Sequence, residues 1–160
     1  MVILESYSHF NGLEFLKVRQ NDLFDSLRQQ VRELDATEFI EPQQDLVLHS
    51  EGQSVDRRFR ERLRTGGWQC SGIASIKCFI KNKIGLKICF GLKAGDEWAE
   101  YCDFCSRYRC DEIDLGIGLF PMESTARHGS DANFRNAVQA LRECGRVAVV
   151  VPLALFAIGA

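Results

Sequence analysis

Residues 76–91, with the sequence IKCFIKNKIGLKICFG, carry the strongest structural signal in the chain. Two apolar-rich runs are separated by Asn82 and Lys83. Asparagine tolerates the positive φ angle that a two-residue hairpin turn requires. The stretch therefore predicts two antiparallel strands joined at this turn, and in that register Cys78 faces Lys87.

Helices and strands alternate along the rest of the chain. Apolar residues at three- and four-residue spacing predict a helix over about 12–34, which Asn11 caps with Glu14 as the reciprocating residue. A nearly continuous apolar run predicts a central strand over 147–158. The other expected elements are an edge strand at 45–49, helices at 55–65, 96–108 and 132–144 (the last capped by Asp131), and a strand at 113–120. This order predicts an α/β (α+β) fold, a mixed β-sheet flanked by helices, in a single domain over residues 1–160.

Basic residues gather in one segment, although the formal net charge is only -2. Residues 56–93 hold ten Lys/Arg against two Asp/Glu, whereas residues 1–55 hold four against ten and residues 94–114 two against seven. Two interpretations are open: a solvated basic face, or a surface that binds phosphate. In the second case the side chains expected to contact a DNA backbone are Arg57, Arg58, Arg60, Arg62, Arg64, Lys77, Lys81, Lys83, Lys87 and Lys93.

The seven cysteines are an odd number and lack the paired spacing of a small secreted scaffold. With no signal peptide at the N-terminus, we expect reduced thiols and a cytoplasmic location. Cys102, Cys105 and Cys110 have a spacing that could bind zinc, but no fourth ligand is obvious near them, so we expect free thiols. The apolar C-terminal run over 147–160 is too short to cross a bilayer as a helix, and we expect no membrane partner.

Several short segments occur in an order and spacing that match one nuclease family. They are 7–12, Phe59, Leu63, Gly67-Trp68, 81–91, 113–117, Pro121-Met122 and 151–153. On these segments, which run over most of the chain, the sequence resembles the BglII-type restriction endonucleases, a branch of the PD-(D/E)XK nuclease fold. The resemblance implies a restriction-endonuclease-like fold, duplex DNA as a partner and a homodimer.

The resemblance also implies where an active site should lie. The family's pattern has an Asp nine residues before a Glu, with a Gln two residues after that Glu. Those positions hold Cys78, Lys87 and Cys89 in this sequence. A Mg²⁺-dependent nuclease needs hard oxygen ligands, whereas a protonated lysine repels the ion and a thiolate is a soft ligand. We therefore expect degenerate catalytic positions and no cofactor, or Mg²⁺ if the protein is active.

Three functions stay open at this point. The leading hypothesis is a catalytically degenerate nuclease domain that keeps a role in binding DNA or phosphate backbone. The second is an active Mg²⁺-dependent type II DNA endonuclease with a relocated metal site, for which Asp56, Glu100 and Asp103 are the candidate acids. The third is a protein-interaction, immunity or anti-defence module, whose acidic segments would bind a protein partner.

Overall fold

The computed structural model describes residues 1–33, 52–72, 78–90, 92, 95–122 and 132–159, with only the backbone described at 52–58 and 144–147. The strands are β1 (Val2–His9), β2 (Gln69–Ser71), β3 (Cys78–Lys81), β4 (Ile84–Ile88), β5 (Leu115–Pro121) and β6 (Leu153–Gly159). The helices are α1 (Gly12–Arg19), α2 (Asn21–Arg32), α4 (Gly52–Thr65), α5 (Glu97–Arg109) and α6 (Phe134–Ala148).

The strands form one mixed sheet in the order β1-β6-β5-β4-β3-β2. β4, β5 and β6 run parallel to one another, and β1, β2 and β3 are added antiparallel to their neighbours. The mixed sheet with flanking helices confirms the predicted fold class. β6 lies between two strands and all seven of its residues are buried, as its apolar run predicts.

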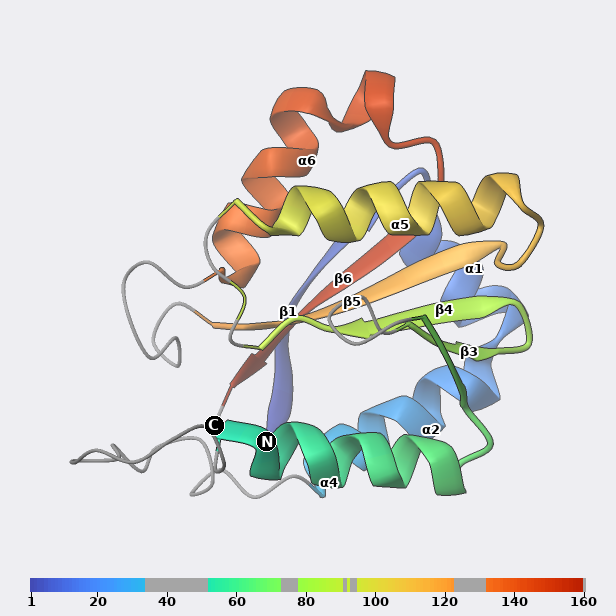
Figure 1. The fold of residues 1–160 in the computed structure, drawn as a ribbon, viewed down its shortest axis with the longest axis vertical. Helices are drawn as coiled ribbons and strands as arrows, with labels where there is room; N and C mark the ends of the chain where they lie inside the picture. The colour runs from blue at the N-terminus through green and yellow to red at the C-terminus, as the bar shows by residue number, and fades with distance from the viewer. Residues whose placement is uncertain (34–51, 73–77, 91, 93–94, 123–131, 160) are drawn as a thin grey trace.

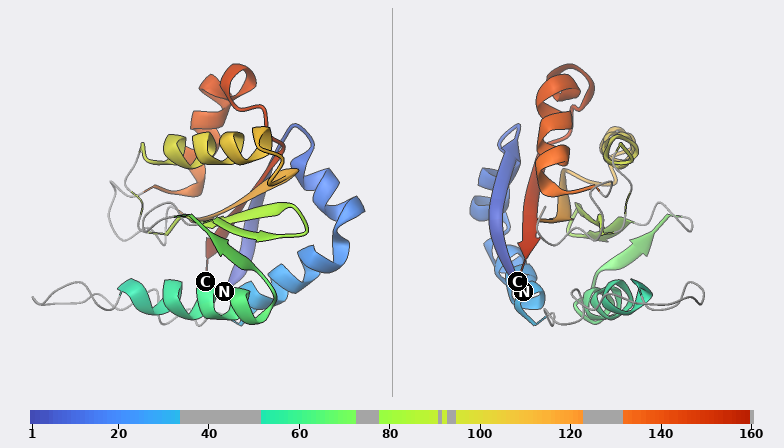
Figure 2. Two further views of the ribbon diagram at one scale, coloured as in Figure 1. Left: turned by 45° about the vertical axis from the view of Figure 1, so that its right-hand side comes forward. Right: turned by 90° about the vertical axis from the view of Figure 1, so that its left-hand side faces the viewer.

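Helices cover both faces of this sheet. Figures 1 and 2 show α5 and α6 on one side of it and α2 and α4 on the other. One apolar core lies under α1, α2 and α4, and it includes Phe59, Phe79 and Phe156. A second core lies under α5 and α6 and includes Phe104 and Leu155. The hairpin of β3 and β4 contributes to both cores, since Phe79 belongs to the first and Cys78 to the second.

The N-terminal region differs from the expectation in two ways. The helix predicted over 12–34 is two helices, because the backbone leaves helical geometry at Gln20 (φ -137°). Asn11 adopts a left-handed conformation and its side chain does not cap α1. The Ser8 hydroxyl takes that role: it accepts a hydrogen bond from the Leu13 amide at 3.2 Å and donates one to Glu14.

Two strands lack a sequence signal that could reveal them. β1 has no alternation of buried and exposed residues, because it lies at the sheet edge and its register shifts between Ile3 and Glu5. β2 spans only three residues. At the other end of the chain α6 continues to Ala148, so the strand predicted from residue 147 begins later, at Leu153.

The remaining predicted elements are close to those observed. The helix expected at 55–65 begins three residues earlier, and Gly67 ends it with a φ of 82°. The cap of α6 is Asn133, whose side-chain oxygen accepts a 3.0 Å hydrogen bond from the Asn136 amide. The proposed cap Asp131 and the proposed strand at 45–49 lie outside the described residues. Among the helices that the structure describes, none is long and apolar enough to cross a membrane.

Candidate functional site

The β3–β4 hairpin brings the three expected catalytic positions to one end of the sheet. Its turn residues, Asn82 and Lys83, have φ angles of 51° and 58°, and a type I′ turn needs positive values at both positions. The paired residues are Phe79 with Leu86, Ile80 with Gly85 and Lys81 with Ile84. The predicted turn and register are therefore confirmed, and the same register sets Lys87 opposite Cys78.

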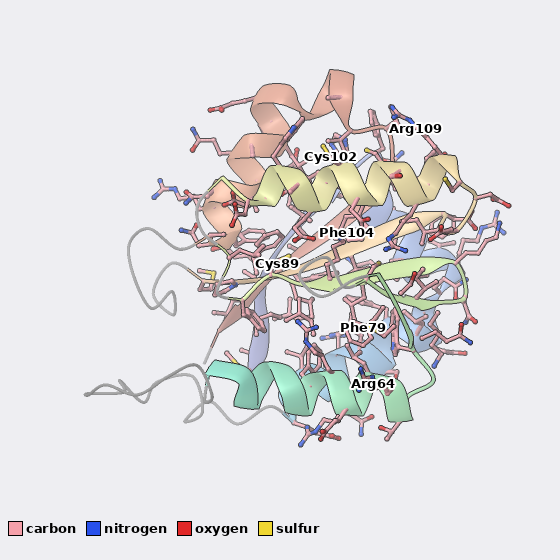
Figure 3. The ribbon with its side chains drawn as sticks, viewed as in Figure 1. Arg64, Phe79, Cys89, Cys102, Phe104 and Arg109 are labelled. Carbon is pink, nitrogen blue, oxygen red and sulfur yellow. The ribbon has the colours of Figure 1, made fainter. Side chains whose placement is uncertain are left out.

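Strand alternation separates the side chains of the hairpin between the two faces. Phe79 lies between the sheet and α4, whereas Phe104 of α5 lies on the opposite face (Figure 3). Cys78 and Lys87 point to the α5 face and are 0% and 1% exposed. Cys89 follows β4 and is buried on the same side. A lysine this deeply buried is uncommon unless it has a partner.

The partners of Lys87 are two carboxylates of α5. Its ammonium donates a hydrogen bond to Glu100, and its Nζ lies 2.8 Å from Oδ2 of Asp103. The same nitrogen lies 5.3 Å from the centroid of the Phe104 ring. Glu100 and Asp103 are three residues apart, so both project from one face of the helix toward the strand. A buried positive charge thus meets two acidic groups and an aromatic face.

The ion pairs continue along α5 toward its C-terminal end. Arg107 donates to Asp103 at 2.8 Å and to Glu112 at 2.8 Å. It also donates a 3.0 Å hydrogen bond to the Ser71 hydroxyl of β2. We call Lys87, Glu100, Asp103, Arg107 and Glu112 the ion-pair network. It joins β4, α5 and β2 around the place where the family's metal ligands are expected.

The protonation states of the site follow from burial and from these partners. Burial raises the pKa of the Cys78 thiol to about 12, and it also raises the pKa of the Cys89 thiol well above its usual range. Burial also acts to raise the pKa of Asp103, but hydrogen bonds from Lys87 and Arg107 outweigh it and hold that pKa below 3.8. Near neutral pH the site therefore contains neutral thiols and an ionised Asp103.

These groups do not fit Mg²⁺, the ion that the family's enzymes typically use. Magnesium needs nearly octahedral oxygen coordination, and protonated thiols offer none. The two nearby carboxylates already accept hydrogen bonds from Lys87, whose charge would repel a cation. The third candidate acid, Asp56, lies in the stretch for which only the backbone is described. The described residues contain no group of three or more His, Cys, Asp or Glu that could hold a metal ion.

The structure brings two of the three proposed acids together, but as partners of an ammonium rather than of a metal. It also changes the expected role of Lys87, which is enclosed and paired and therefore cannot contact a phosphate in solvent. Sequence reasoning missed Arg107 and Glu112. The spacing of Asp103 and Arg107, four residues apart on a helix, is the signal that could have found the first of them.

The described members of the predicted basic set differ in their contacts. Arg60 lies over the Phe79 ring at 5.9 Å, and Arg62 pairs with Glu33 at 3.4 Å. Lys83 pairs with Asp111 at 2.7 Å. Of the remaining described ones, Lys81 donates to the Gly66 carbonyl and Arg64 is exposed on α4. The side chains of Arg57, Arg58, Lys77 and Lys93 lie outside the described residues.

The cysteines proposed as alternative zinc ligands diverge. Cys102 and Cys110 are exposed, whereas Cys105 is buried, with its Sγ 3.8 Å from the Ala148 carbonyl oxygen. Cys102 lies on the outer side of α5 in Figure 3, away from the sheet. All three are free thiols in the structure.

Comparisons with known proteins identify a family and a fold. The family model described as restriction endonuclease BglII/BglIII matches residues 4–158. Among solved structures, free BglII aligns with a TM-score of 0.72 at 13% identity, over 99% of this chain and 79% of its own. BglII in complex with a DNA 16-mer aligns with a TM-score of 0.76 at 13% identity, over 100% of this chain and 77% of its own. No curated protein matches the sequence.

Proposed function

Since the chain belongs to the BglII/BglIII restriction endonuclease family, we propose that it is a DNA-binding member of that family without metal-dependent cleavage activity. The observation that carries the proposal is the position of Lys87. Its ammonium lies between Glu100 and Asp103, where a nuclease of this family would hold a metal ion. The ion-pair network would then keep the shape of the former active site without its chemistry.

Loss of catalysis follows from charge and ligand type. Hydrolysis of a phosphodiester by this kind of enzyme depends on a cation that polarises the phosphate and activates water. Lys87 supplies one positive charge, but it is enclosed and reaches neither a phosphate nor a water in solvent. The second candidate function, cleavage at a relocated site using Glu100 and Asp103, is disfavoured because both carboxylates already accept hydrogen bonds from Lys87.

The DNA-binding half of the proposal rests on the fold and on exposed cations. BglII, whose fold this chain shares, has been crystallised with DNA. The segment 56–93 carries the basic surplus, and Arg64 and Lys83 within it are exposed. The Lys83–Asp111 pair is exposed too, and such pairs contribute only about 0.2–1 kcal/mol, so a phosphate can replace the carboxylate.

A cleavage assay tests the first half. Supercoiled plasmid incubated with excess protein and either Mg²⁺ or Mn²⁺ should stay intact. Nicking that is lost in a Glu100→Gln or Asp103→Asn variant would establish the relocated metal site and overturn the proposal.

A binding assay tests the second half. Retardation of duplex DNA in a gel should weaken steeply with salt, because phosphate contacts release counterions. Arg64→Gln and Lys83→Gln should each reduce the slope of log K against log[salt] by about 1. The matched control for Arg64 is Arg109→Gln, which removes an exposed charge from α5, on the other side of the sheet from α4. Absence of retardation at low salt, together with a stoichiometric protein partner in a pull-down, would favour the interaction-module alternative.

The homodimer expected from the family resemblance stays a prediction. Light scattering coupled to size-exclusion chromatography would measure the mass of the particle in solution, with and without duplex DNA.

A further inference from the structure

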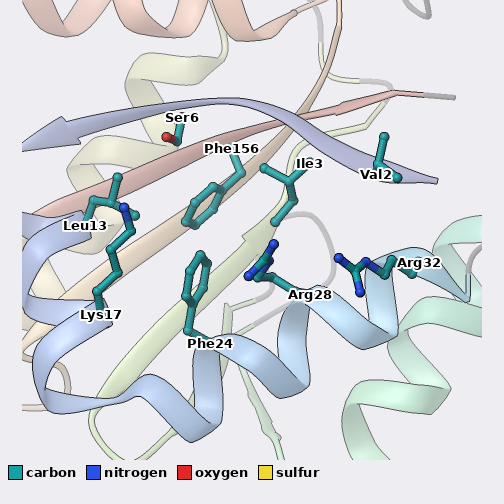
Figure 4. A pocket seen from close by; sticks show the side chains of 9 residues that line it. All are labelled: Val2, Ile3, Ser6, Leu13, Lys17, Phe24, Arg28, Arg32 and Phe156. Atoms are coloured by element: carbon teal, nitrogen blue, oxygen red, sulfur yellow. The ribbon is translucent and has the colours of Figure 1, made fainter.

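A pocket of about 430 Å³ lies at the opposite edge of the sheet from the ion-pair network, between β1 and the helices α1 and α2. Figure 4 shows that its side chains come from four elements, β1, α1, α2 and β6. Three cations, Lys17, Arg28 and Arg32, line it together with the apolar side chains of Leu13, Phe24 and Phe156. From this set we infer a binding site for a small aromatic phosphomonoester, meaning a planar apolar ring that carries one phosphate group.

The positive charge of the pocket points to an anion. Lys17, Arg28 and Arg32 line it, and no carboxylate is among the described lining residues. Among the residues that the structure describes, Arg28 has one acidic partner, Asp25, at 3.7 Å, and both side chains of that pair are about half exposed. An exposed ion pair of this kind contributes little to stability, so Asp25 does not prevent Arg28 from binding an anion. Cations that line one pocket without an acidic residue among its described walls favour a negatively charged ligand there.

The number and kind of cations favour phosphate over a carboxylate. A phosphomonoester carries a charge near -2 at neutral pH and has three strong acceptor oxygens. The guanidinium groups of Arg28 and Arg32 present planar donor pairs that match such oxygens, and Lys17 adds a mobile point charge from α1. The Ser6 hydroxyl is a further polar group on the pocket wall.

The floor of the pocket is apolar, and for this reason we expect the ligand to carry an aromatic ring. Leu13, Phe24 and Phe156 form it, and each is at most 8% exposed. The two phenyl rings stack with centroids 5.5 Å apart, and Arg28 lies 5.7 Å from the centroid of the Phe24 ring. An inorganic anion would leave this apolar surface exposed to water, whereas a ring attached to the phosphate would bury it. The volume also falls in the range of small-molecule sites rather than that of a single ion.

The inference does not depend on the proposed function. β1 and β4 are separated in the sheet by β6 and β5, and the pocket shares no residue with the ion-pair network. DNA binding and ligand binding here can therefore succeed or fail separately.

Titration with phenyl phosphate, followed by isothermal calorimetry and by amide chemical shifts, tests the site. Saturable one-to-one binding is expected, with shifts centred on Leu13, Lys17 and Phe24. Arg28→Gln and Lys17→Gln should each weaken binding about tenfold, since each removes a hydrogen bond to a charged group. Arg19→Gln removes an exposed charge from the same helix as Lys17 but outside the pocket, and should leave binding unchanged.

Two reference ligands separate the contributions of ring and phosphate. Phenol and inorganic phosphate should each bind at least about tenfold more weakly than phenyl phosphate, because each leaves half of the pocket unsatisfied. Inorganic phosphate that binds as tightly as phenyl phosphate would overturn the aromatic part of the inference. Absence of saturable binding, or equal binding by the Arg28→Gln, Lys17→Gln and Arg19→Gln variants, would overturn the site itself.

Discussion

Lys87 on β4 and Asp103 on α5 are joined by a 2.8 Å ion pair in an interior where the lysine is 1% exposed. This contact fixes α5 against the strand that a nuclease of this family would use to hold its metal. A buried charge costs several kcal/mol to desolvate, and its partners offset that cost only while they are present. A single substitution that removes one partner therefore leaves the other charge buried and uncompensated, which lowers the free energy of unfolding.

Removing the ammonium should destabilise the protein strongly. Lys87→Met leaves Glu100 and Asp103 without their shared cation, and breaking a buried pair in this way costs about 3–5 kcal/mol. Urea unfolding measures the loss. The matched control is Lys83→Met, whose exposed pair with Asp111 should be worth only about 0.2–1 kcal/mol. Equal effects of the two substitutions would mean that the buried pair does not organise the site.

A compensated variant separates charge from packing. Lys87→Met combined with Glu100→Gln and Asp103→Asn removes the cation together with both of its acidic partners. Most of the lost free energy of unfolding should return, because no uncompensated charge stays buried next to the methionine. If the triple variant is no more stable than Lys87→Met alone, the loss comes from packing against Phe104 rather than from charge.

Acid should weaken the network through Asp103. Hydrogen bonds from Lys87 and Arg107 overcome the effect of burial and hold the pKa of Asp103 below 3.8, so the folded state binds its proton less readily than the unfolded state. The resulting stability is complete above the ordinary pKa of 3.8 and is lost as the pH falls through the lower pKa of the folded state.

The free energy of unfolding, measured from pH 6 down to pH 2, tests this expectation. Asp103→Asn should flatten the decline in the acidic part of that range, whereas Asp25→Asn, at an exposed and loosely paired position, should follow the wild-type curve. A wild-type decline that Asp103→Asn leaves unchanged would assign the acid sensitivity to other carboxylates.

Thiol chemistry offers an independent view of the same interior. Burial raises the pKa of Cys78 to about 12 and raises that of Cys89 as well, so neither forms the reactive thiolate at mild alkaline pH. Iodoacetamide applied to the native protein should modify the exposed Cys70, Cys102 and Cys110, and peptide mass spectrometry would identify the sites. Cys78 and Cys89 should react only after denaturation. Native modification of Cys78 at the rate of Cys102 would show that the site opens in solution.

The hairpin could be predicted from sequence because its signals are local. A two-residue turn that begins with Asn82 fixes the register of the two strands, and that register sets Lys87 opposite Cys78. The helix carrying Glu100 and Asp103 was also within reach, because three-residue spacing on a helix puts two side chains on one face. Local pattern is thus enough to predict the hairpin and the helix on which these side chains lie.

The contact between the hairpin and α5 could not be predicted in the same way. The contact between Lys87 and Asp103 depends on how far α5 lies along the sheet, which no periodicity encodes. Two carboxylates can pair with an ammonium group or bind a metal ion. The presence of Glu100 and Asp103 in the sequence therefore could not show which of the two cations they contact. The edge strand β1 could not be predicted either. No described strand pairs with its outer side, and its register shift removes the alternation that marks a strand.

Restoring the family's pattern should turn the site into one that binds a divalent cation. In a variant with Cys78→Asp, Lys87→Glu and Cys89→Gln, two new carboxylates and an amide oxygen join Glu100 and Asp103. Arg107 offsets part of the mutual repulsion of the acids, and a bound divalent cation would offset the rest. The variant should be less stable than the wild type without metal, and Mn²⁺ or Mg²⁺ should raise its midpoint of thermal unfolding. The wild-type midpoint should not respond to either ion. The matched control is the single Cys89→Gln variant, which adds no carboxylate and should not respond, and a response in that control would locate the cation elsewhere on the protein.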